Sequence, residues 1–425
     1  MSIAGLIIRV AVVVIFFVLL FLSQRFWYRS LWQETDRWKS VILRRVARSL
    51  AVALLVFLIF SLVDRMLIGI LPRGGLFSFL FAVTQLWLVS SLLAYVFFKL
   101  VIALGWAWFG IKNLVSPPRP AEPENSERRV FLRHAAQLTA AVPLVAAVYG
   151  FSTQRFGFRV LRTEVPIPGL PPGLDGLQIV QLSDIHIGDF MPRGEVRRAV
   201  DMANSLGAHL AVVTGDFITG ENDPLEACVE ELQRLRAPLG VFSCNGNHEI
   251  YAHAEDLVER LFMQHGMRLL RQQCIELEWQ GGRLNLIGVD YQRDRMVRGP
   301  KRPMLEGVES LVRRDMPNVL LSHNPNSFYK AAELGIELTL AGHTHGGQVQ
   351  VEIVDKRWNP ARFITPFIAG LYRLPLGSGA GASSSTLANA SRQAFLYVNR
   401  GLGTIGVPAR LAVDPEITLL TLRRA

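Results

Sequence analysis

Two histidines one residue apart, His343 and His345, lie in the segment AGHTHGG at 341–347. The segment directly follows a short apolar run, Ile336–Leu340, which has the length and composition of a buried strand. Histidines at the end of such a strand are able to hold a metal ion, although a His-x-His turn is more often structural. The metal interpretation therefore depends on the residues that follow the other strands.

Further residues with metal-binding side chains follow earlier apolar runs. The runs that we interpret as strands are Gln178–Leu182, Leu210–Thr214, Val241–Cys244 and Val319–Leu321. The residues that follow them are Asp184 and His186, then Asp216, then Asn247, His248 and Glu249, and finally His323. Taken singly, each residue is explained by a turn or a helix cap. Because so many of these side chains follow strands, we expect them to meet at one edge of one sheet.

Carboxylate, imidazole and amide groups together suit a pair of divalent metal ions. Two ions about 3.5–4 Å apart need a bridging carboxylate, and we expect Asp216 to supply it. Such a pair lowers the pKa of a bridging water, so that hydroxide forms near neutral pH, and it neutralises charge on a phosphoryl oxygen during in-line attack. The residues thus predict a phosphoester hydrolase. Mn, Fe, Zn and Co all accept mixed nitrogen and oxygen ligands, so the metal is not identified.

The ordered motifs Asp-x-His, Gly-Asp, Gly-Asn-His-Glu, His and Gly-His-x-His resemble those of the calcineurin-like metallophosphoesterases over residues 177–424. The segments GHTHGGQ at 342–348 and YVNRGLGTIGV at 397–407 are similar to a bacterial membrane-associated branch of that superfamily. Some members of the branch carry a twin-arginine signal, and some hydrolyse lipid-linked or lipid-A-precursor substrates. The resemblance implies a double β-sandwich flanked by helices.

The resemblance also implies a role for each site residue. One metal ion would be held by Asp184, His186, Asp216 and His345. The other would be held by Asp216, Asn247, His323 and His343. His248 would lie over the phosphate, where it would stabilise charge or protonate the leaving group. Arg400 and Arg410 are either phosphate contacts or ordinary surface arginines.

Two positions depart from the pattern of the branch. Tyr291 and Asn326 stand where the branch commonly has acids. Neither position belongs to the implied ligand set, so the departures concern contacts with the substrate. The segment 376–391, rich in Gly, Ser and Ala, interrupts the domain and has the composition of a flexible loop. We expect surface or packing positions for His209, His253 and His265.

The chain from about Leu177 onward alternates short apolar runs with helical patterns, which predicts an α/β layered domain. A sixth strand is expected at Leu284–Val289. Helices are expected at Arg193–Ser205, Pro224–Arg236, Ala254–Gln264 and Met304–Arg314. Asp223 should cap the second of these helices, with Pro224 in its first turn.

The N-terminal third has the composition of a membrane protein. Of the 425 residues 50% are hydrophobic, and the mean hydropathy is +0.27. Three membrane spans are predicted, at Val10–Leu22 with the residues before it, at Ser49–Leu71 and at Phe77–Phe98. The run Leu100–Ile111 extends the third helix, lies in the interface or forms a re-entrant piece. Basic residues beside the spans explain the net charge of +10 better than nucleic-acid binding does, so no nucleic acid is expected.

Charge also predicts the orientation of the chain in the membrane. Basic residues outnumber acidic ones between the first two predicted spans, which places that loop in the cytoplasm. A Pro-rich linker at 116–127 leads to the basic sequence RRVFLR at 128–133 and a weakly apolar segment at 134–150. The sequence is either an internal twin-arginine export signal or the basic flank of an ordinary helix. If 135–150 crosses the membrane, the rest of the chain faces outward; otherwise it stays on the cytoplasmic side.

Three regions are therefore expected. An all-α transmembrane region covers 1–115, a linker with the twin-arginine-like motif and a further membrane segment covers 116–163, and the metallophosphoesterase domain covers 164–425. We expect a multi-pass protein of the bacterial inner (cytoplasmic) membrane, with the catalytic domain on the periplasmic side. Three cysteines, Cys228, Cys244 and Cys274, are too few for a disulfide framework or a Cys-rich zinc site.

The expected function is hydrolysis of a phosphodiester, pyrophosphate or phosphomonoester by hydroxide that bridges two divalent ions. A lipid or lipid-linked phosphate, such as a UDP-diacylglucosamine-type compound, is the expected substrate because the membrane spans keep the enzyme next to such molecules. One alternative is a phosphatase or phosphodiesterase that acts on soluble nucleotides or phosphoproteins. Another alternative is a non-catalytic membrane scaffold that retains the fold.

Overall fold

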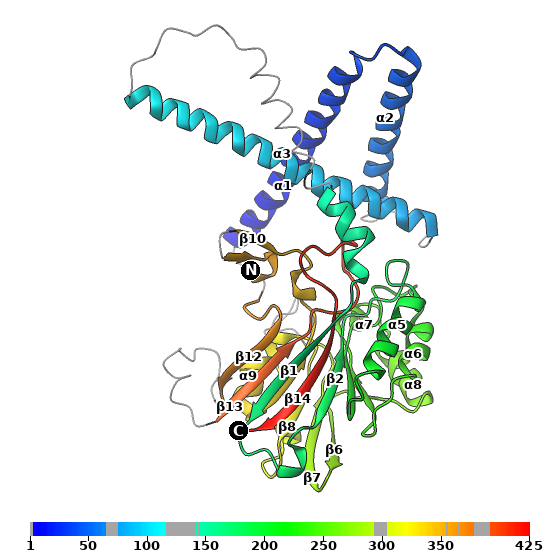
Figure 1. Ribbon diagram of the computed structural model, residues 1–425, viewed down its shortest axis with the longest axis vertical. Coiled ribbons are helices and arrows are strands. Elements are labelled where there is room, and N and C mark those ends of the chain that lie inside the picture. The colour runs from blue at the N-terminus through cyan, green and yellow to red at the C-terminus, as the bar shows by residue number, and fades with distance from the viewer. Residues whose placement is uncertain are drawn as a thin grey trace. The chain divides into compact units, whose positions relative to one another are not determined.

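The computed structural model describes residues 3–64, 75–115, 142, 145–292, 304–353, 356–363, 365–377 and 392–425. The chain divides into two compact units, Met1–Tyr149 and Gly150–Ala425. In Figure 1 the described part of the first unit is helical, and the second unit contains the sheets. The division falls inside the second predicted region, 116–163.

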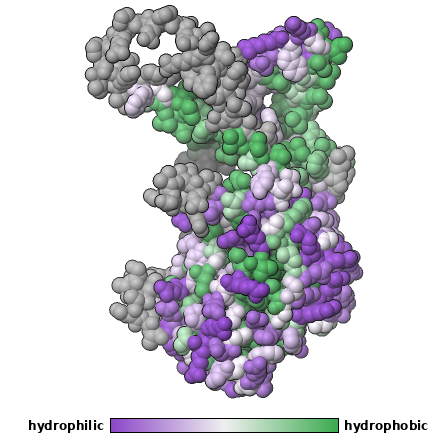
Figure 2. Space-filling view, viewed as in Figure 1, coloured by the Kyte–Doolittle hydropathy of each residue, from purple (hydrophilic) through white to green (hydrophobic). Residues whose placement is uncertain are grey.

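The described part of the N-terminal unit consists of long helices. They are α1 (Ile3–Thr35), α2 (Val41–Val63) and α3 (Gly75–Val115), and residues 145–149 are also helical. Two stretches are long and apolar enough to cross a membrane, Val14–Thr35 in α1 and Phe77–Gly105 in α3. Figure 2 shows hydrophobic residues gathered over these helices, in contrast to the mixed surface of the second unit.

The three predicted membrane spans agree to different degrees with the helices of the structure. The third lies within the apolar stretch of α3, whereas the first overlaps the apolar stretch of α1 only at 14–22. The predicted span Ser49–Leu71 lies in α2 as far as Val63, and among the described residues of α2 no stretch is both long and apolar enough to cross a membrane. The run Leu100–Ile111 continues α3, so extension of the third helix is the alternative that the structure shows. The motif at 128–133 lies outside the described residues.

Helices α1 and α3 are joined by polar side chains. The Nε2 of Gln24 donates to the Oγ of Ser91 at 2.9 Å, and the Nε1 of Trp87 donates to the Oε1 of Gln24 at 3.0 Å. The hydroxyl of Ser23 and the indole N–H of Trp27 both donate to the carbonyl oxygen of Ser91. Polar groups in an apolar surrounding need partners, so these hydrogen bonds hold the two helices side by side.

Two six-stranded sheets form the C-terminal unit, and Figure 1 shows them with helices alongside. The order of the first sheet is β1 (Arg159–Ile167), β14 (Glu416–Arg424), β2 (Gln178–Leu182), β3 (Leu210–Thr214), β4 (Val241–Cys244) and β5 (Arg268–Leu269). The order of the second is β12 (Gly370–Pro375), β13 (Gln393–Val398), β9 (Leu338–Ala341), β8 (Asn318–Leu321), β7 (Gly282–Gly288) and β6 (Gln273–Trp279). A small hairpin consists of β10 (Val351–Ile353) and β11 (Lys356–Trp358). Strands β2 to β5 are mutually parallel, as are β13, β9, β8 and β7.

The core explains why the central strands are continuous apolar runs. In β2, Ile179 points into the core shared by the two sheets, while Val180 points toward the helices that cover the first sheet. The covering helices are α5 (Arg193–Asn204), α6 (Leu225–Leu232) and α8 (Glu255–Gln264). Helix α9 (Phe328–Leu334) packs against the second sheet. Because both faces of the central strands are covered, alternation between apolar and polar residues disappears there, and the predicted double β-sandwich flanked by helices is confirmed.

Two local predictions were wrong. In place of the helix expected at Met304–Arg314 there is only a 3-10 turn at Val308–Leu311, because Gly307 before it has a left-handed φ of 83°. Asp223 does not cap α6: its Oδ2 accepts hydrogen bonds from the backbone N–H groups of Thr219 and Gly220 at 2.6 and 2.9 Å. Asp223 thus closes the turn before the helix.

Glu231 of α6 is a buried carboxylate that joins α6 to α5. Its oxygens accept hydrogen bonds from Arg197 at 2.8 and 3.0 Å and from Arg193 at 2.6 Å. The hydrogen bonds from Arg197 and Arg193 outweigh burial and lower the pKa of Glu231 to about 2. The carboxylate therefore stabilises the fold above its unfolded pKa near 4.5, and this contribution is lost as the pH falls toward 2.

We expect Glu231→Gln to lower the free energy of unfolding at pH 7 by roughly 1–3 kcal/mol, since it removes a buried charge-assisted hydrogen-bond acceptor. The difference between the variant and the natural protein should shrink as the pH falls below 4.5 and Glu231 itself becomes protonated. Urea unfolding at a series of pH values measures both effects. A difference that stays constant down to pH 2.5 would contradict the assignment.

Candidate metal centre

The residues with metal-binding side chains come from two sheets. Asp184, His186 and Asp216 follow β2 and β3 of the first sheet, while His323, His343 and His345 follow β8 and β9 of the second. Asn247 begins the short helix α7 (Asn247–Tyr251) after β4. The expectation of one edge of one sheet was therefore wrong. The sandwich brings the carboxyl ends of strands from both sheets together.

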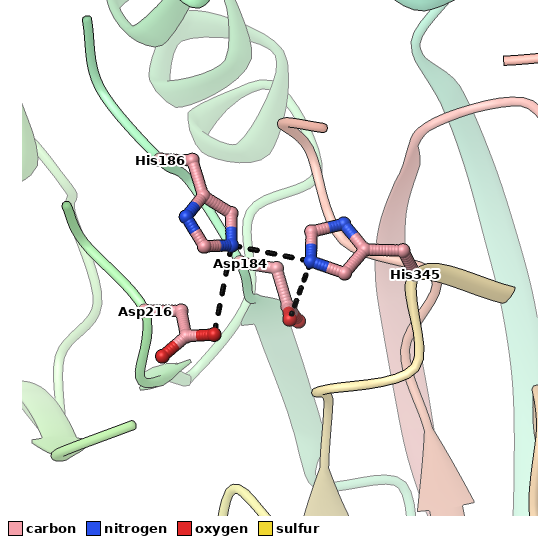
Figure 3. Close-up of side chains that lie close together, drawn as sticks. All are labelled: Asp184, His186, Asp216 and His345. Atoms are coloured by element: carbon pink, nitrogen blue, oxygen red, sulfur yellow. Dashed lines mark hydrogen bonds and ion pairs between the residues drawn. The ribbon is translucent and has the colours of Figure 1, made fainter. Parts of the chain in front are cut away.

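Four of the side chains form a first cluster, Asp184, His186, Asp216 and His345, whose ligand atoms all lie within 4.8 Å of one another. Figure 3 shows them converging on one point from three loops. The two Nε2 atoms of His186 and His345 are 3.1 Å apart, and that of His345 is 3.3 Å from Asp184 Oδ1. All four residues are buried.

A second cluster consists of Asp216, His323 and His343. The Nε2 of His323 lies 3.0 Å from the Oδ2 of Asp216, and the rings of His323 and His343 are 5.1 Å apart. Asn247 directly precedes His248 in the chain, and the backbone N–H of His248 donates to Asp216 Oδ1 at 3.0 Å. Asp216 is common to both clusters, as expected for a bridging carboxylate.

Hydrogen bonds to the backbone orient the buried imidazoles. The Nδ1 atoms of His186, His323 and His345 lie 3.0, 2.6 and 3.4 Å from the carbonyl oxygens of Ile218, Thr214 and Gly403, respectively. A carbonyl only accepts, so each Nδ1 must carry the hydrogen. The opposite nitrogen, Nε2, is then free to bind a metal ion, and this arrangement is usual for metal-binding histidines.

The donor set fits divalent metal ions. With both Nδ1 atoms protonated, neutral His186 and His345 point two lone pairs at each other across 3.1 Å. The Oδ1 of Asn247 is buried without a hydrogen-bond partner among the described residues, and the Nε2 of His323 faces the Oδ2 of Asp216 at 3.0 Å. A buried polar atom without a partner costs roughly 1–3 kcal/mol. One cation in each cluster would satisfy these atoms, and mixed nitrogen and oxygen ligands suit a transition metal.

The charges of the side chains also favour cation binding. Burial lowers the pKa of His186 to about 3 and places that of His345 well below its usual range, so both are neutral at pH 7. Burial opposes protonation of His323, but the carboxylates of Asp216 and Asp184 outweigh it and raise its pKa to about 10. A metal ligand must be deprotonated, so metal binding at His323 would release a proton.

The backbone at the clusters is held in an unusual conformation. Asp184, His186, Asp216, His343 and His345 all have a positive φ, between 49° and 75°. The left-handed region costs energy for residues other than glycine and persists where the surroundings impose it. Hydrogen bonds from the N–H groups of Asp184 and His186 to the carbonyls of Gly215 and Asp216, at 3.0 Å each, impose it here. The loops after β2 and β3 thereby lie side by side.

Glu249, which the motif contained without an assigned role, organises two of the loops. Its buried carboxylate accepts hydrogen bonds from the N–H groups of Asp216, Phe217, Ile218 and Gly246, at 2.8–3.3 Å. Burial and the charge of Asp216 raise the pKa of Glu249 to about 7. One side chain thus fixes both the bridging residue and the start of α7.

Glu249→Gln should destabilise the protein by roughly 1–3 kcal/mol, because the amide NH₂ group would face backbone N–H donors that the carboxylate now satisfies. We also expect the variant to lose bound metal during dialysis faster than the natural protein. Urea unfolding and metal analysis would measure the two effects. Unchanged stability together with unchanged metal retention would show that Glu249 does not organise the loops.

His248 lies beside the first cluster and is half-buried. Its Nδ1 lies 2.8 Å from the carbonyl oxygen of Thr219, and its ring meets that of His186 edge-on at 4.8 Å between centroids. The carbonyl fixes the hydrogen on Nδ1 and leaves Nε2 to exchange a proton. Its location and partial exposure suit a residue that contacts a substrate.

The two arginines have different positions. Arg400 is partly exposed, with its Nε 3.4 Å from Glu416 Oε2. Arg410 is fully buried and donates only to backbone carbonyls among the described residues. It therefore lies inside the domain and not at the surface where we expected a phosphate contact or an ordinary surface arginine.

The two departures from the branch pattern also have defined places. Tyr291 packs its ring against those of His343 and His323, at 5.3 and 5.9 Å between centroids. The Oδ1 of Asn326 accepts a hydrogen bond from Thr365 at 2.8 Å. Of the two, Tyr291 is next to the second cluster.

Replacing the two histidines of the HTH segment should affect different ions. We expect His345→Ala to weaken binding at the first cluster and His343→Ala to weaken binding at the second, since Asp216 alone is shared. Each variant should retain about one tightly bound ion per chain, as measured by elemental analysis after dialysis. Loss of all metal from both variants, with the fold intact, would contradict two separate clusters.

Comparisons with known proteins show the family to which the chain is similar. The calcineurin-like phosphoesterase family matches residues 177–347. The uncharacterized metallophosphoesterase YkuE of Bacillus subtilis is 30% identical over 303 residues, which cover 70% of this chain and 97% of YkuE. Proteins named "Transmembrane protein with metallophosphoesterase domain" from Danio rerio and Bos taurus are each 31% identical and cover 68% and 70% of this chain. The matched regions span 62% and 64% of those two relatives, which is less than two thirds of their length.

Proposed function

Since the chain belongs to the calcineurin-like metallophosphoesterase family, we propose that it hydrolyses a phosphate ester with the help of two divalent metal ions. The observation that carries the proposal is the sharing of Asp216 by two clusters of metal-binding side chains. The first ion would be held by Asp184, His186, Asp216 and His345, and the second by Asp216, Asn247, His323 and His343. When bound, such ions activate water and neutralise the charge of a phosphoryl group.

The chain's own residues supply the remaining requirements. The carbonyls of Ile218, Thr214 and Gly403 hold the imidazoles in the orientation that ligands need. Asp216 is fixed by its backbone hydrogen bond to Glu249, at 2.9 Å. Ligands held in advance in this way bind an ion without reorganising, which favours both affinity and catalysis.

His248 is proposed as the residue that protonates the leaving group or stabilises the phosphate. Thr219 holds the Nδ1 hydrogen of His248, so Nε2 is the atom that would give up or accept a proton. The half-buried ring is beside the first cluster, where an ester oxygen could reach it. General acid catalysis of this kind contributes about 10²–10⁴-fold to the rate.

We propose a lipid or lipid-linked phosphate as the substrate. The support is the pair of membrane-length helices, together with relatives that are named transmembrane proteins. A membrane anchor raises the local concentration of amphipathic substrates and gives no comparable advantage for soluble ones. The charge pattern further leads us to propose a multi-pass protein of the bacterial inner membrane with a periplasmic domain. A C-terminal reporter that is active only in the cytoplasm would refute that orientation.

Two substitutions test the proposed chemistry. His248→Ala should lower the rate on an aryl phosphodiester about 10²–10⁴-fold with metal content unchanged. Asp216→Asn should lower both the rate and the metal content, because it removes the shared carboxylate. His265→Ala provides a control: its Nδ1 contacts Gln233 and it lies outside both clusters. Full activity of both site variants, with fold and expression intact, would favour the non-catalytic scaffold.

The substrate class can be tested separately with the purified, metal-loaded protein. We expect nucleotide-linked lipids, phospholipids or undecaprenyl-type pyrophosphates in detergent to be hydrolysed faster than soluble nucleotides of the same bond type. Generic aryl phosphodiesters report on the chemistry alone. Faster hydrolysis of nucleotides or phosphoproteins would contradict the lipid proposal and support the soluble-substrate alternative.

A further inference from the structure

We propose that Arg410 is the positioning residue of the first metal cluster and acts on it through the segment 400–403 (RGLG). The inference rests on the proposed metal centre, since it concerns how that centre is held. It assigns a role to the YVNRGLGTIGV segment, which the catalytic proposal does not use. It also gives a reason for a fully buried arginine in this domain.

The surroundings of Arg410 are unusual for a buried cation. Its NH2 donates to the carbonyl oxygens of Arg400 and Gly401 at 2.9 and 3.0 Å, and both its Nε and NH2 contact the carbonyl oxygen of Gly403. All these acceptors belong to one short segment. A buried charge is costly unless hydrogen bonds satisfy it, and the segment supplies every acceptor that the Nε and NH2 of Arg410 use, while NH1 has none among the described residues. The planar fork of arginine suits several carbonyls at once, and a lysine does not provide it.

The segment 400–403 lies directly against the first cluster. The N–H of Gly403 donates to the carbonyl of Asp184 at 2.7 Å, and the N–H of Leu402 donates to that of Ser183 at 3.0 Å. A Cβ atom on Gly401 would lie 2.6 Å from the Cβ of Asp184. A Cβ atom on Gly403 would lie 2.3 Å from the carbonyl oxygen of Ile185. The backbone of the segment thus fits closely over the loop that carries Asp184 and His186.

The carbonyl of Gly403 makes the connection specific. It accepts from Arg410 and also lies 3.4 Å from the Nδ1 of His345. Arg410 therefore fixes the oxygen that orients one ligand of the first cluster, while the same segment fixes the loop of two others. The second cluster does not use this oxygen, since the Nδ1 of His323 is 2.6 Å from Thr214 O. Loss of Arg410 should accordingly weaken one ion and spare the other.

The test is a metal titration of the purified full-length protein in detergent, starting from metal-free samples and using Mn²⁺. Arg410→Lys and Arg410→Met are the variants. We expect them to keep one ion at the natural affinity and to bind the other about 10–100-fold more weakly, which is the usual effect of removing a residue that orients a ligand. His345→Ala and His343→Ala show which ion is affected: the Arg410 variants should resemble His345→Ala.

Arg197→Lys is the matched control. Arg197 also hydrogen-bonds to a buried group, Glu231, but it lies in the covering helix α5 and not in the segments that carry the cluster residues. It should bind both ions normally, even if its stability falls. Gly403→Ala retains Arg410 and displaces the segment, so it should also weaken the first ion. It decides the question if the Arg410 variants do not fold.

Three results would overturn the inference. Two ions bound with natural affinity by Arg410→Lys, together with a raised KM, would make Arg410 a substrate contact. Equal weakening of both ions in Arg410→Lys and Gly403→Ala would make its role a general structural one. If Gly403→Ala binds two ions as the natural protein does, the segment 400–403 does not position the first cluster. In contrast, natural protein that binds none of Mn²⁺, Fe²⁺, Zn²⁺ and Co²⁺ would refute the proposed metal centre itself.

Discussion

The metal centre depends on hydrogen bonds between imidazole Nδ1 atoms and backbone carbonyl oxygens. In His186, His323 and His345 this contact leaves Nε2 facing the interior of the cluster. In His186 and His345 burial also lowers the pKa, so that the lone pair of Nε2 carries no proton at pH 7. Buried nitrogen and oxygen atoms of the clusters are thus placed to bind a cation. Without a cation, these buried polar atoms lower the stability of the protein.

The carbonyl oxygens themselves are placed by the sandwich. Thr214 ends β3 and Ile218 follows it, whereas Gly403 follows β13 in the other sheet. A single sheet would place its strand ends in a row, and distant ends would not converge. Two sheets packed face to face bring loops from both sides onto one point, where left-handed residues turn the side chains inward. The buried acid Glu249 satisfies backbone N–H groups of the loop that carries Asp216, and the buried Arg410 satisfies backbone carbonyls of the segment that packs against the loop of Asp184 and His186.

Much of this arrangement was predictable from the sequence. Strands β2, β3 and β4 were located at their observed bounds, because strands covered on both faces are uninterrupted apolar runs. The residues of the two clusters were recognisable as candidates because they follow those runs. The division into two sheets was not visible in the runs themselves, since an apolar strand does not reveal its neighbour.

Other features depend on contacts that are distant in sequence. The failure at Met304–Arg314 came from the left-handed Gly307, whose φ a helical pattern does not reveal. Arg410 has the composition of a surface residue, and only the carbonyls of 400–403 explain its burial. The acid of Gly-Asn-His-Glu gave no sign that it would accept four backbone hydrogen bonds from two loops.

The central claim is that one carboxylate, Asp216, joins two metal ions. Electron paramagnetic resonance of the protein loaded with two equivalents of Mn²⁺ tests it most directly, because ions bridged by a carboxylate are magnetically coupled. The account predicts a spectrum of a coupled pair at two equivalents, which gives way to signals of isolated ions in Asp216→Asn. A spectrum of isolated Mn²⁺ at two equivalents in the natural protein would contradict it.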